Sequence, residues 1–358
     1  MRVLFLQQQP CIRTLKYAAG LRSTDRHFEL GFACQGETLT GWYGAGDELF
    51  DRWWHLDGEA EADLGRVLAE FRPDVIHSHN LPDRLTVLAV SVVDGRVPVI
   101  HDSHDLQSLR RTPYEDGFPE PDEPALLEKA AVHGCTALVG VSAEMLAEID
   151  ARHGLPDHAL EFANYALALD LPSVLPPADR TRTGPSRLVY EGTLSTNGGH
   201  YDLRVLFVEI VSQGLRLDIY PARPAPEYEA LASDHPGMTC HRMLPPPELL
   251  RRLPEYDFGW AGFNASLNRA HLDTALPNKV FEYLGCGLPV LTLDHRALQR
   301  LVAEEGVGVT LPAVDGLGDR LAELDVAALR RQVAAVRHRL TIEANISRLV
   351  DLYDQVVG

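Results

Sequence analysis

Short apolar strands alternate with helices through the first 150 residues, and this alternation constrains the fold more than any other feature of the chain. Strands are expected at residues 3–6, 28–33, 74–77, 97–101 and 137–141. The spacing of apolar residues predicts helices at 14–22, 60–70, 84–93, 123–132 and 143–152. Strands that are apolar throughout are typical of a parallel sheet covered by helices on both faces. The first half therefore predicts an α/β domain with a doubly wound sheet.

Residues 169–186 interrupt this alternation with four prolines among small and charged residues, which is typical of a linker between domains. The alternation then resumes, with strands expected at 187–190, 216–220, 257–261 and 289–293 and helices at 202–213, 226–233 and 246–253. A chain of 358 residues is long enough for two domains. We expect Rossmann-like domains at 1–170 and 187–339, a linker at 171–186 and a last helix at 340–358.

The segment 276–292 predicts a short helix that opens at Pro277, closes at two glycines and leads into a strand. Lys279 falls in the first turn, where a cation opposes the positive end of the helix macrodipole. A phosphate at the helix N-terminus would be stabilised by the charge of Lys279 and by the positive end of the macrodipole. Glu282 and Tyr283 follow on the same side of the helix. A surface ion pair is the simpler interpretation, but the other residues of the helix are largely apolar.

The run from Pro277 to Val290 fits the pattern Pro-x-Lys-x-Phe-Glu-Tyr-x-x-x-Gly-x-Pro-Val. It resembles the signature of retaining glycosyltransferases with the GT-B fold, in the broad family 4 group. The resemblance implies two Rossmann-like domains facing each other across a cleft, the first for the acceptor and the second for a nucleotide-diphosphate-sugar donor. It implies transfer to an acceptor hydroxyl with retention of configuration and without a metal or other cofactor. Glu282 would bind the ribose or sugar of the donor, and residues 340–358 would pack back on the first domain.

The chain departs from the family in the polar, glycine-rich turn after the first strand of the second half. The backbone N–H groups of such a turn are suited to phosphate. Family members often carry an arginine and a lysine here, where this chain has Thr193 and Gly199. Lys279 is then the main cation left for the diphosphate, with Arg204 and Arg269 as further candidates.

The family's paired glutamates, eight residues apart, are also incomplete, because Thr274 stands eight residues before Glu282. The loop 263–275 that precedes the helix is long for a strand–helix connection, and long loops in compact domains are often functional. The residues expected to bind the donor are Gly192, Thr193, Ser195, Asp273, Thr274, Leu276, Asn278, Lys279 and Tyr283.

Two neighbouring strands of the first half end in histidines, His77 and His79 on one and His101 and His104 on the next. Ligands of doubly wound sheets bind beyond the carboxyl ends of the strands. One interpretation is a sugar site, in which neutral imidazoles hydrogen-bond hydroxyl groups. A second is a zinc site, although no later pair of ligands completes it. A third is structural, with the rings capping neighbouring backbone.

His104 with Asp105 resembles the Asp-x-His-Glu/Asp stretch found after a first-domain strand in many family 4 enzymes. The resemblance carries the active-site histidine of the family to His104, with His101 as the second choice. Together with Glu282 these two histidines are the predicted catalytic residues.

The chain carries 33 lysines and arginines against 51 acidic residues, a net charge of −18, which argues against nucleic acid and anionic membranes as partners. A local basic patch near the N-terminus remains open, formed by Arg13, Lys16, Arg22 and Arg26. No apolar run is long enough to span a bilayer, and the first residues do not resemble a signal peptide. Five scattered cysteines are typical of reduced thiols. We therefore expect a cytoplasmic protein, and its arginine and alanine usage is typical of a bacterial source.

The leading hypothesis is glycosyl transfer to a soluble small molecule or glycan. The GT-B scaffold also serves nucleotide-sugar epimerases, which would epimerise or hydrolyse the donor without an acceptor. The departures from the family pattern leave a degenerate, non-catalytic partner subunit open as well. A metal hydrolase is the remaining alternative, and it depends on the histidine pairs.

Overall fold

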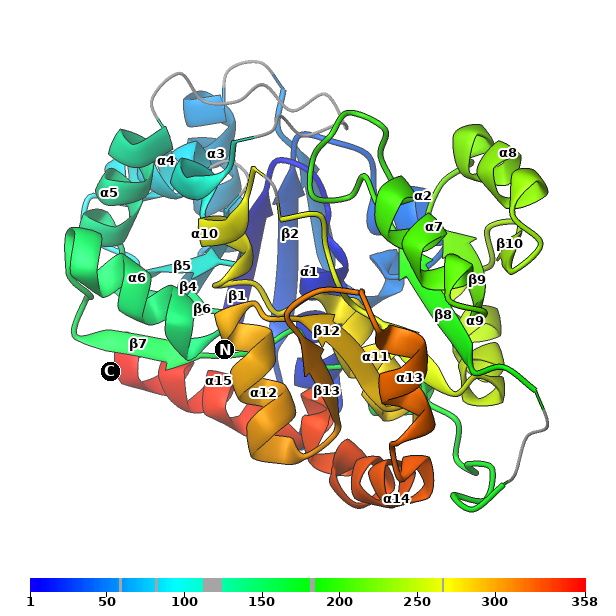
Figure 1. Ribbon diagram of the computed structural model, residues 1–358. Helices are drawn as coiled ribbons and strands as arrows, with labels where there is room; N and C mark the ends of the chain where they lie inside the picture. The colour runs from blue at the N-terminus through cyan, green and yellow to red at the C-terminus, as the bar shows by residue number, and fades with distance from the viewer. Residues whose placement is uncertain (58–59, 81–82, 112–123, 181–183, 266) are drawn as a thin grey trace. The chain divides into compact units, whose positions relative to one another are not determined.

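The computed structural model describes residues 1–57, 60–80, 83–111, 124–180, 184–265 and 267–358. Within these ranges the chain divides into two compact units, and each is described by itself. Residues 1–110, 124–167 and 342–358 form the first unit, and residue 111 together with residues 168–341 forms the second. Figure 1 labels their helices and strands.

The first unit is built on a seven-stranded parallel sheet with the order β3-β2-β1-β4-β5-β6-β7. Its strands are β1 (Arg2–Gln7), β2 (Glu29–Cys34), β3 (Arg52–His55), β4 (Val75–His79), β5 (Val99–Ser103), β6 (Ala137–Gly140) and β7 (His158–Glu161). Its helices are α1 (Ile12–Arg22), α2 (Leu39–Tyr43), α3 (Ala60–Phe71), α4 (Arg84–Val93), α5 (Pro124–Gly134), α6 (Ala143–His153) and α15 (Ile342–Val357). Short 3₁₀ turns lie at Asp47–Leu49 and Gln107–Leu109.

Side chains of β1 alternate between two hydrophobic clusters. Val3 and Phe5 belong to the cluster that includes residues of α1 and α15, while Leu4 and Leu6 belong to the cluster that includes residues of α3 and α4. This is the two-residue period of a strand that is buried on both faces. The sheet is thus covered by helices on both sides, as the apolar strands predict.

The last helix, α15, belongs to the first unit and packs closely on α1. A Cβ atom at Gly20 of α1 would lie 2.3 Å from Cγ2 of Ile342, so the small residue permits the approach. The backbone N–H of Ile342 donates to the carbonyl of Ala166 over 2.8 Å. The end of the chain is therefore part of the first hydrophobic core.

Strands β4 and β5 each end two residues later than the sequence predicts. His77, His79 and His101 consequently lie inside strands, and His104 is the first residue after β5. Only His104 of the four thus follows a carboxyl end of the sheet, where ligands of such folds bind.

The second unit contains a six-stranded parallel sheet with the order β10-β9-β8-β11-β12-β13. Its strands are β8 (Arg187–Gly192), β9 (Arg216–Pro221), β10 (Met238–Cys240), β11 (Phe258–Trp260), β12 (Val290–Leu293) and β13 (Gly308–Leu311). Its helices are α7 (Arg204–Ser212), α8 (Pro226–Asp234), α9 (Pro246–Arg252), α10 (Arg269–Leu272), α11 (Asn278–Gly285), α12 (Arg296–Glu305), α13 (Leu317–Ala322) and α14 (Val326–Val336). Short 3₁₀ turns lie at Ala168–Asp170, Leu253–Glu255 and Arg337–Leu340.

Part of the proline-rich segment packs on the end of α11. Cβ atoms at Gly285 and Gly287 would lie 2.5 and 2.7 Å from side-chain atoms of Leu171 and Leu175. Gly287 also has a φ of +81°, so glycine is favoured there on both grounds. The glycines of the 276–292 segment therefore end the helix and allow the proline-rich segment to pack against it.

No helix within the described ranges combines the length and apolar character needed to cross a bilayer.

Candidate functional site

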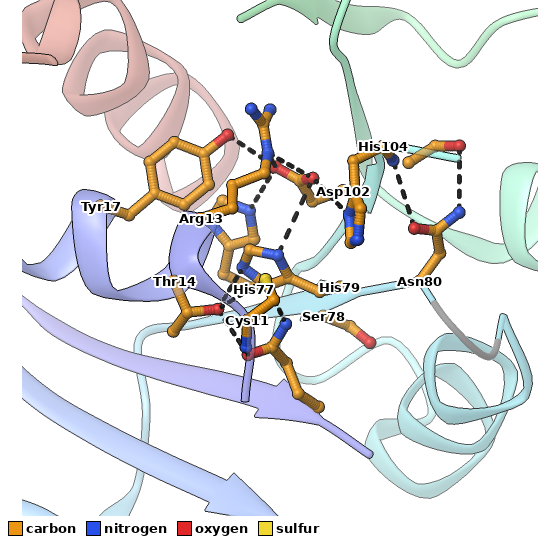
Figure 2. A network of polar contacts seen from close by, with 12 residues as sticks. Cys11, Arg13, Thr14, Tyr17, His77, Ser78, His79, Asn80, Asp102 and His104 are labelled. Atoms are coloured by element: carbon orange, nitrogen blue, oxygen red, sulfur yellow. Dashed lines mark hydrogen bonds and ion pairs between the residues drawn. The ribbon is translucent and has the colours of Figure 1, made fainter. Parts of the chain in front are cut away.

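A buried polar network lies at the carboxyl ends of β4 and β5, with the carboxylate of Asp102 at its centre, as Figure 2 shows. Nε of Arg13 lies 2.9 and 3.1 Å from the two carboxylate oxygens, and the hydroxyl of Tyr17 donates over 2.7 Å. Burial by itself would raise the pKa of Asp102, but Arg13 and the neighbouring hydrogen-bonded histidines hold that pKa well below its usual range. These contacts favour the ionised form of Asp102.

His77 and His79 stack on each other inside this network, with ring centroids 4.9 Å apart. Nδ1 of His77 lies 2.7 Å from the hydroxyl of Tyr353 on α15, and its Nε2 lies 3.3 Å from Asp102. Nε2 of His79 lies 3.3 Å from the hydroxyl of Thr14. Burial lowers the pKa of both histidines, which favours neutral rings. Both rings are fully buried, so the structural interpretation fits them best.

His101, the second-choice catalytic residue, is also fully buried. Its Nδ1 lies 2.9 Å from the hydroxyl of Thr86, and its Nε2 lies 3.5 Å from the carboxyl of Asp83. Burial lowers the pKa of His101 to about 4 and raises that of Asp83 to about 8. A neutral ring held inside the sheet favours a structural role for His101.

His104 is the histidine of this group that reaches solvent, with 14% of its side chain exposed. Its backbone N–H donates to the side-chain oxygen of Asn80 over 3.2 Å, and its Nδ1 lies 3.6 Å from Asp102. Of the residues in Figure 2, His104 is thus placed to contact a bound molecule while one face of its ring is held by the network.

Ligand atoms of His77, His79 and Asp102 lie within 4.8 Å of one another, which raises the question of a metal. Arg13 and Tyr17 already donate hydrogen bonds to the carboxylate of Asp102. The positive charge of the guanidinium would repel a divalent cation bound to the same carboxylate. His77 uses both ring nitrogens in other contacts. These residues therefore suit a hydrogen-bonded network better than a zinc site.

In the second unit, Lys279 lies in the first turn of α11 with only 7% of its surface exposed. Its Nζ lies 3.9 Å from the ring centroid of Tyr190 and 5.4 Å from that of Phe263. Among the described residues Nζ has no hydrogen-bond partner. Burial lowers the pKa of Lys279 to about 7, against the charges of Glu191 and Glu282, which raise it. A buried cation is thus held between aromatic rings with its N–H donors unused.

Gly192 allows this close approach. A Cβ atom there would lie 3.2 Å from Nζ of Lys279, and the residue has a φ of +120°, a conformation that side chains rarely adopt. The structure thus brings together two predicted donor-binding residues, Gly192 on β8 and Lys279 on α11.

The rest of the glycine-rich turn is closed by its own side chains. The oxygen of Asn197 accepts from the hydroxyl of Ser195 over 3.1 Å and from the N–H of Gly199 over 2.8 Å. The N–H of Gly198 donates to Asp202 over 3.0 Å. These two backbone N–H groups are therefore taken up inside the turn. Thr193 is exposed next to Gly192.

The two arginines proposed as replacement cations are both paired with acids. Arg204 holds Asp202 through two hydrogen bonds of 2.7 and 2.8 Å, and Arg269 contacts Asp294 over 3.0 Å and Asp273 over 3.3 Å. Lys279, in contrast, makes no hydrogen bond within the described part of the chain. This difference favours Lys279 as the cation for a phosphate.

The remaining predicted donor residues are placed as follows. Asp273 accepts from the backbone N–H of Arg296 at the start of α12, and the buried hydroxyl of Thr274 donates to the carbonyl of His271. Tyr283 is fully buried; its oxygen accepts from the N–H of Glu191 over 2.9 Å and its hydroxyl donates to the carbonyl of Trp260. Half-buried residues are Asn278 and Glu282, and Leu276 is buried. Donor contacts from these residues stay a prediction.

Sequence reasoning missed three residues around Lys279, namely Tyr190, Glu191 and Phe263. Tyr190 and Glu191 lie in the last three residues of β8, and Phe263 follows β11 by three residues. In the sequence the two aromatic residues fit ordinary core positions. The signal in the sequence is Glu191 directly after the apolar run 188–190 and before Gly192. A carboxylate that continues such a buried run implies a nearby cation.

Residues 14–164 match the family model of a glycosyl transferase 4-like domain. The match contains Tyr17, His77, Asp102 and His104. This part of the chain is similar to that glycosyltransferase family. The family resemblance deduced from the 276–292 segment is thus confirmed through a different part of the chain. No protein of curated function matches the sequence.

The solved structures that resemble this protein cover both of its units. The sucrose-phosphate synthase of Thermosynechococcus elongatus has 14% identity and a TM-score of 0.71, with 99% of each chain covered. HepE of Anabaena, solved in complex with UDP, has 12% identity and a TM-score of 0.71, with 99% of this chain and 100% of HepE covered. A glycosyltransferase of Rickettsia africae has 10% identity and the same TM-score, with 100% and 98% covered. At these identities the likeness concerns the fold, and it confirms the predicted GT-B fold.

Proposed function

We propose that the protein transfers a sugar from a nucleotide-diphosphate donor to an acceptor hydroxyl, with retention of the anomeric configuration. The match to a glycosyl transferase 4-like domain supports this class of reaction. Retention and independence of metal ions come from the family resemblance of the 276–292 segment. We propose a soluble acceptor, either a small molecule or a glycan, because the net charge of −18 disfavours anionic surfaces. We also propose a reaction in the cytoplasm, since the five scattered cysteines are typical of reduced thiols.

The observation that supports a nucleotide-diphosphate donor is the environment of the Lys279 ammonium group. Burying an ammonium group is costly unless it is paired or hydrogen-bonded. Here the rings of Tyr190 and Phe263 and the charges of Glu191 and Glu282 offset that cost, but the N–H donors remain unused in the described structure. An anion with several acceptor oxygens completes such an environment, and a diphosphate at the N-terminus of α11 has that chemistry.

In the proposed reaction Lys279 and the N-terminus of α11 stabilise the negative charge that develops on the leaving diphosphate. Both are in place before the reaction, so they stabilise the transition state without reorganising. Glu282 lies one turn further along the helix and accepts hydrogen bonds from the ribose hydroxyls. Tyr283 holds the backbone of Glu191 and Trp260, so we assign it a positioning role. His104 contacts a sugar hydroxyl.

The test uses UDP-glucose and UDP-galactose first, because HepE was solved with UDP and with UDP-glucose. The protein is incubated with each donor and a panel of saccharides in the presence of a chelator, and NMR follows the anomeric protons. We expect a glycoside with the anomeric configuration of the donor. Lys279→Gln and Glu282→Gln should abolish transfer, while Lys129→Gln, on the exposed face of α5, leaves it unchanged.

Incubation without an acceptor separates the alternatives. Rapid loss or epimerisation of the donor by the protein alone would replace transfer by epimerase or hydrolase activity. A ligand at 100 times its dissociation constant stabilises a protein by about 2.7 kcal/mol, so a bound nucleotide raises the melting temperature. If UDP, GDP, TDP and ADP all leave it unchanged, the proposal is wrong and a non-catalytic partner protein takes its place.

A further inference from the structure

Asp102 and His104 face each other across the edge of the buried network. Oδ1 of Asp102 lies 3.6 Å from Nδ1 of His104, and Nδ1 is buried without a closer hydrogen-bond partner in the described structure. The ring of His79 stands edge-on to that of His104, with centroids 6.0 Å apart. Asn80 holds the backbone N–H of His104. The imidazole is therefore held from one side, with its Nδ1 directed at a carboxylate (Figure 2).

The carboxylate is an acceptor and cannot be a donor. Arg13 and Tyr17 donate to it, and the charge of Arg13 favours the ionised form. Asp102 is fully buried, so water does not compete for its oxygens. A ring nitrogen that faces such an acceptor is favourable only when it carries the proton. The proton of a neutral His104 thus belongs on Nδ1, and its Nε2 carries a free lone pair.

We propose that Asp102 is a positioning residue that fixes His104 as the Nδ1–H tautomer, so that Nε2 accepts a hydrogen bond from a sugar hydroxyl. An aspartate that holds a histidine in one tautomer performs the same task in serine proteases, where it also orients the ring. Here Nε2 of His104 is a neutral hydrogen-bond acceptor. It suits a hydroxyl group, which can donate, and disfavours a phosphate oxygen, which can only accept. Only this last step rests on the proposed function, since the tautomer is a property of the free protein.

The first measurement uses the full chain without any substitution. Histidines are labelled with ¹⁵N, and long-range ¹H–¹⁵N correlation spectra report which ring nitrogen carries the proton. His104→Gln identifies the signals by their disappearance. We expect the His104 pattern of a protonated Nδ1 and a bare Nε2 at pH 8. A proton on Nε2, or exchange between both tautomers, would overturn the proposal.

The second measurement is kinetic and uses Asp102→Asn. An amide in place of the carboxylate presents a mixture of donor and acceptor, so the tautomer of His104 is no longer fixed. We expect kcat to fall by about 10²-fold, as for a mispositioned catalytic group, with an unchanged KM for the donor. An unchanged kcat contradicts the proposal. If this variant does not fold, the spectrum of the unsubstituted protein still decides.

The two failures are distinguishable. If no nucleotide sugar is turned over but His104 is the Nδ1–H tautomer, the assignment of Asp102 stands and the proposed transfer falls. If transfer is observed and the tautomer is the other one, only the inference about Asp102 is wrong.

Discussion

The guanidinium of Arg13 and the carboxylate of Asp102 form an ion pair that is almost completely removed from solvent. Their side chains are 4% and 0% exposed, and Nε of Arg13 contacts both carboxylate oxygens. Arg13 also donates to the carbonyl of Phe162 over 2.7 Å and to the side chain of Asn164 over 3.0 Å. One side chain thus joins α1, β5 and the segment that follows β7.

Arg13→Leu should destabilise the protein by about 3–5 kcal/mol, because it leaves a buried carboxylate without its counter-charge. The measurement is urea unfolding at pH 7. The pair lowers the pKa of Asp102, so its contribution is fully present above the ordinary carboxyl pKa of about 4 and is lost as the pH falls through the folded-state value. The difference between the two proteins should therefore shrink in acid.

The matched control is Arg26→Leu. Arg26 also pairs with an aspartate, Asp354, but their side chains are 41% and 46% exposed. Exposed pairs contribute about 0–1 kcal/mol. Equal losses in the two variants would mean that burial of the Arg13 pair is irrelevant to its energy.

The sequence predicts the interior of both sheets and misses their edges. All four unpredicted strands are edge strands, namely β3, β7, β10 and β13. Their residues are partly exposed, so they lack the continuous apolar run of the inner strands. Every inner strand was predictable because burial on both faces leaves that run in the sequence.

Buried charges were less predictable, because their partners are remote in the chain. The basic patch left open near the N-terminus does not form: Arg13 and Lys16 are buried, while Arg22 and Arg26 pair with aspartates. Asp102, the partner of Arg13, lies 89 residues away. Local spacing cannot distinguish such a cation from a solvated one.

Tyr353→Phe should cost about 1–3 kcal/mol of stability, the usual price of a buried polar group that loses its partner. The hydroxyl of Tyr353 lies 2.7 Å from Nδ1 of His77, and both side chains are fully buried. The change removes the hydroxyl and keeps the ring on α15. A double-mutant cycle with His77→Phe isolates the pair. A coupling energy near zero would show that this contact does not hold α15 to the sheet.

Gly192→Ala should weaken nucleotide-diphosphate binding by displacing the ammonium of Lys279. The new Cβ would lie 3.2 Å from Nζ, at a residue with a φ of +120°. Gly198→Ala is the matched control, since Gly198 also has a positive φ, +79°, but has no atom within 4 Å of the Cβ position. Isothermal titration with UDP measures both variants.

Backbone strain is common to the two glycine variants, so both should lose some stability. Only Gly192→Ala should also lose affinity for UDP. Equal affinities in the two variants would show that the contact between Gly192 and Lys279 has no part in binding.

Affinity for UDP should fall as the pH rises from 7 to 9, by about tenfold per pH unit once the free protein loses its proton. The cause is Lys279, whose pKa burial lowers to about 7 in the free protein. A bound diphosphate favours the protonated form of Lys279, so the protein takes up a proton when UDP binds. The affinity therefore falls at high pH, where the free protein has lost that proton. The neighbouring tyrosines Tyr190 and Tyr283 stay protonated in this range, because burial raises their pKa values well above 10.

Lys279→Gln removes the titrating group and serves as the control. It should bind UDP weakly at every pH between 7 and 9, without the slope, because a neutral amide takes up no proton on binding. The diphosphate itself has completed its ionisation above pH 7, since the last phosphate pKa is about 6. Any slope that persists in this variant must come from another group. Equal slopes in both proteins would show that Lys279 carries its proton in the free and bound states alike, and that its burial does not tune donor binding.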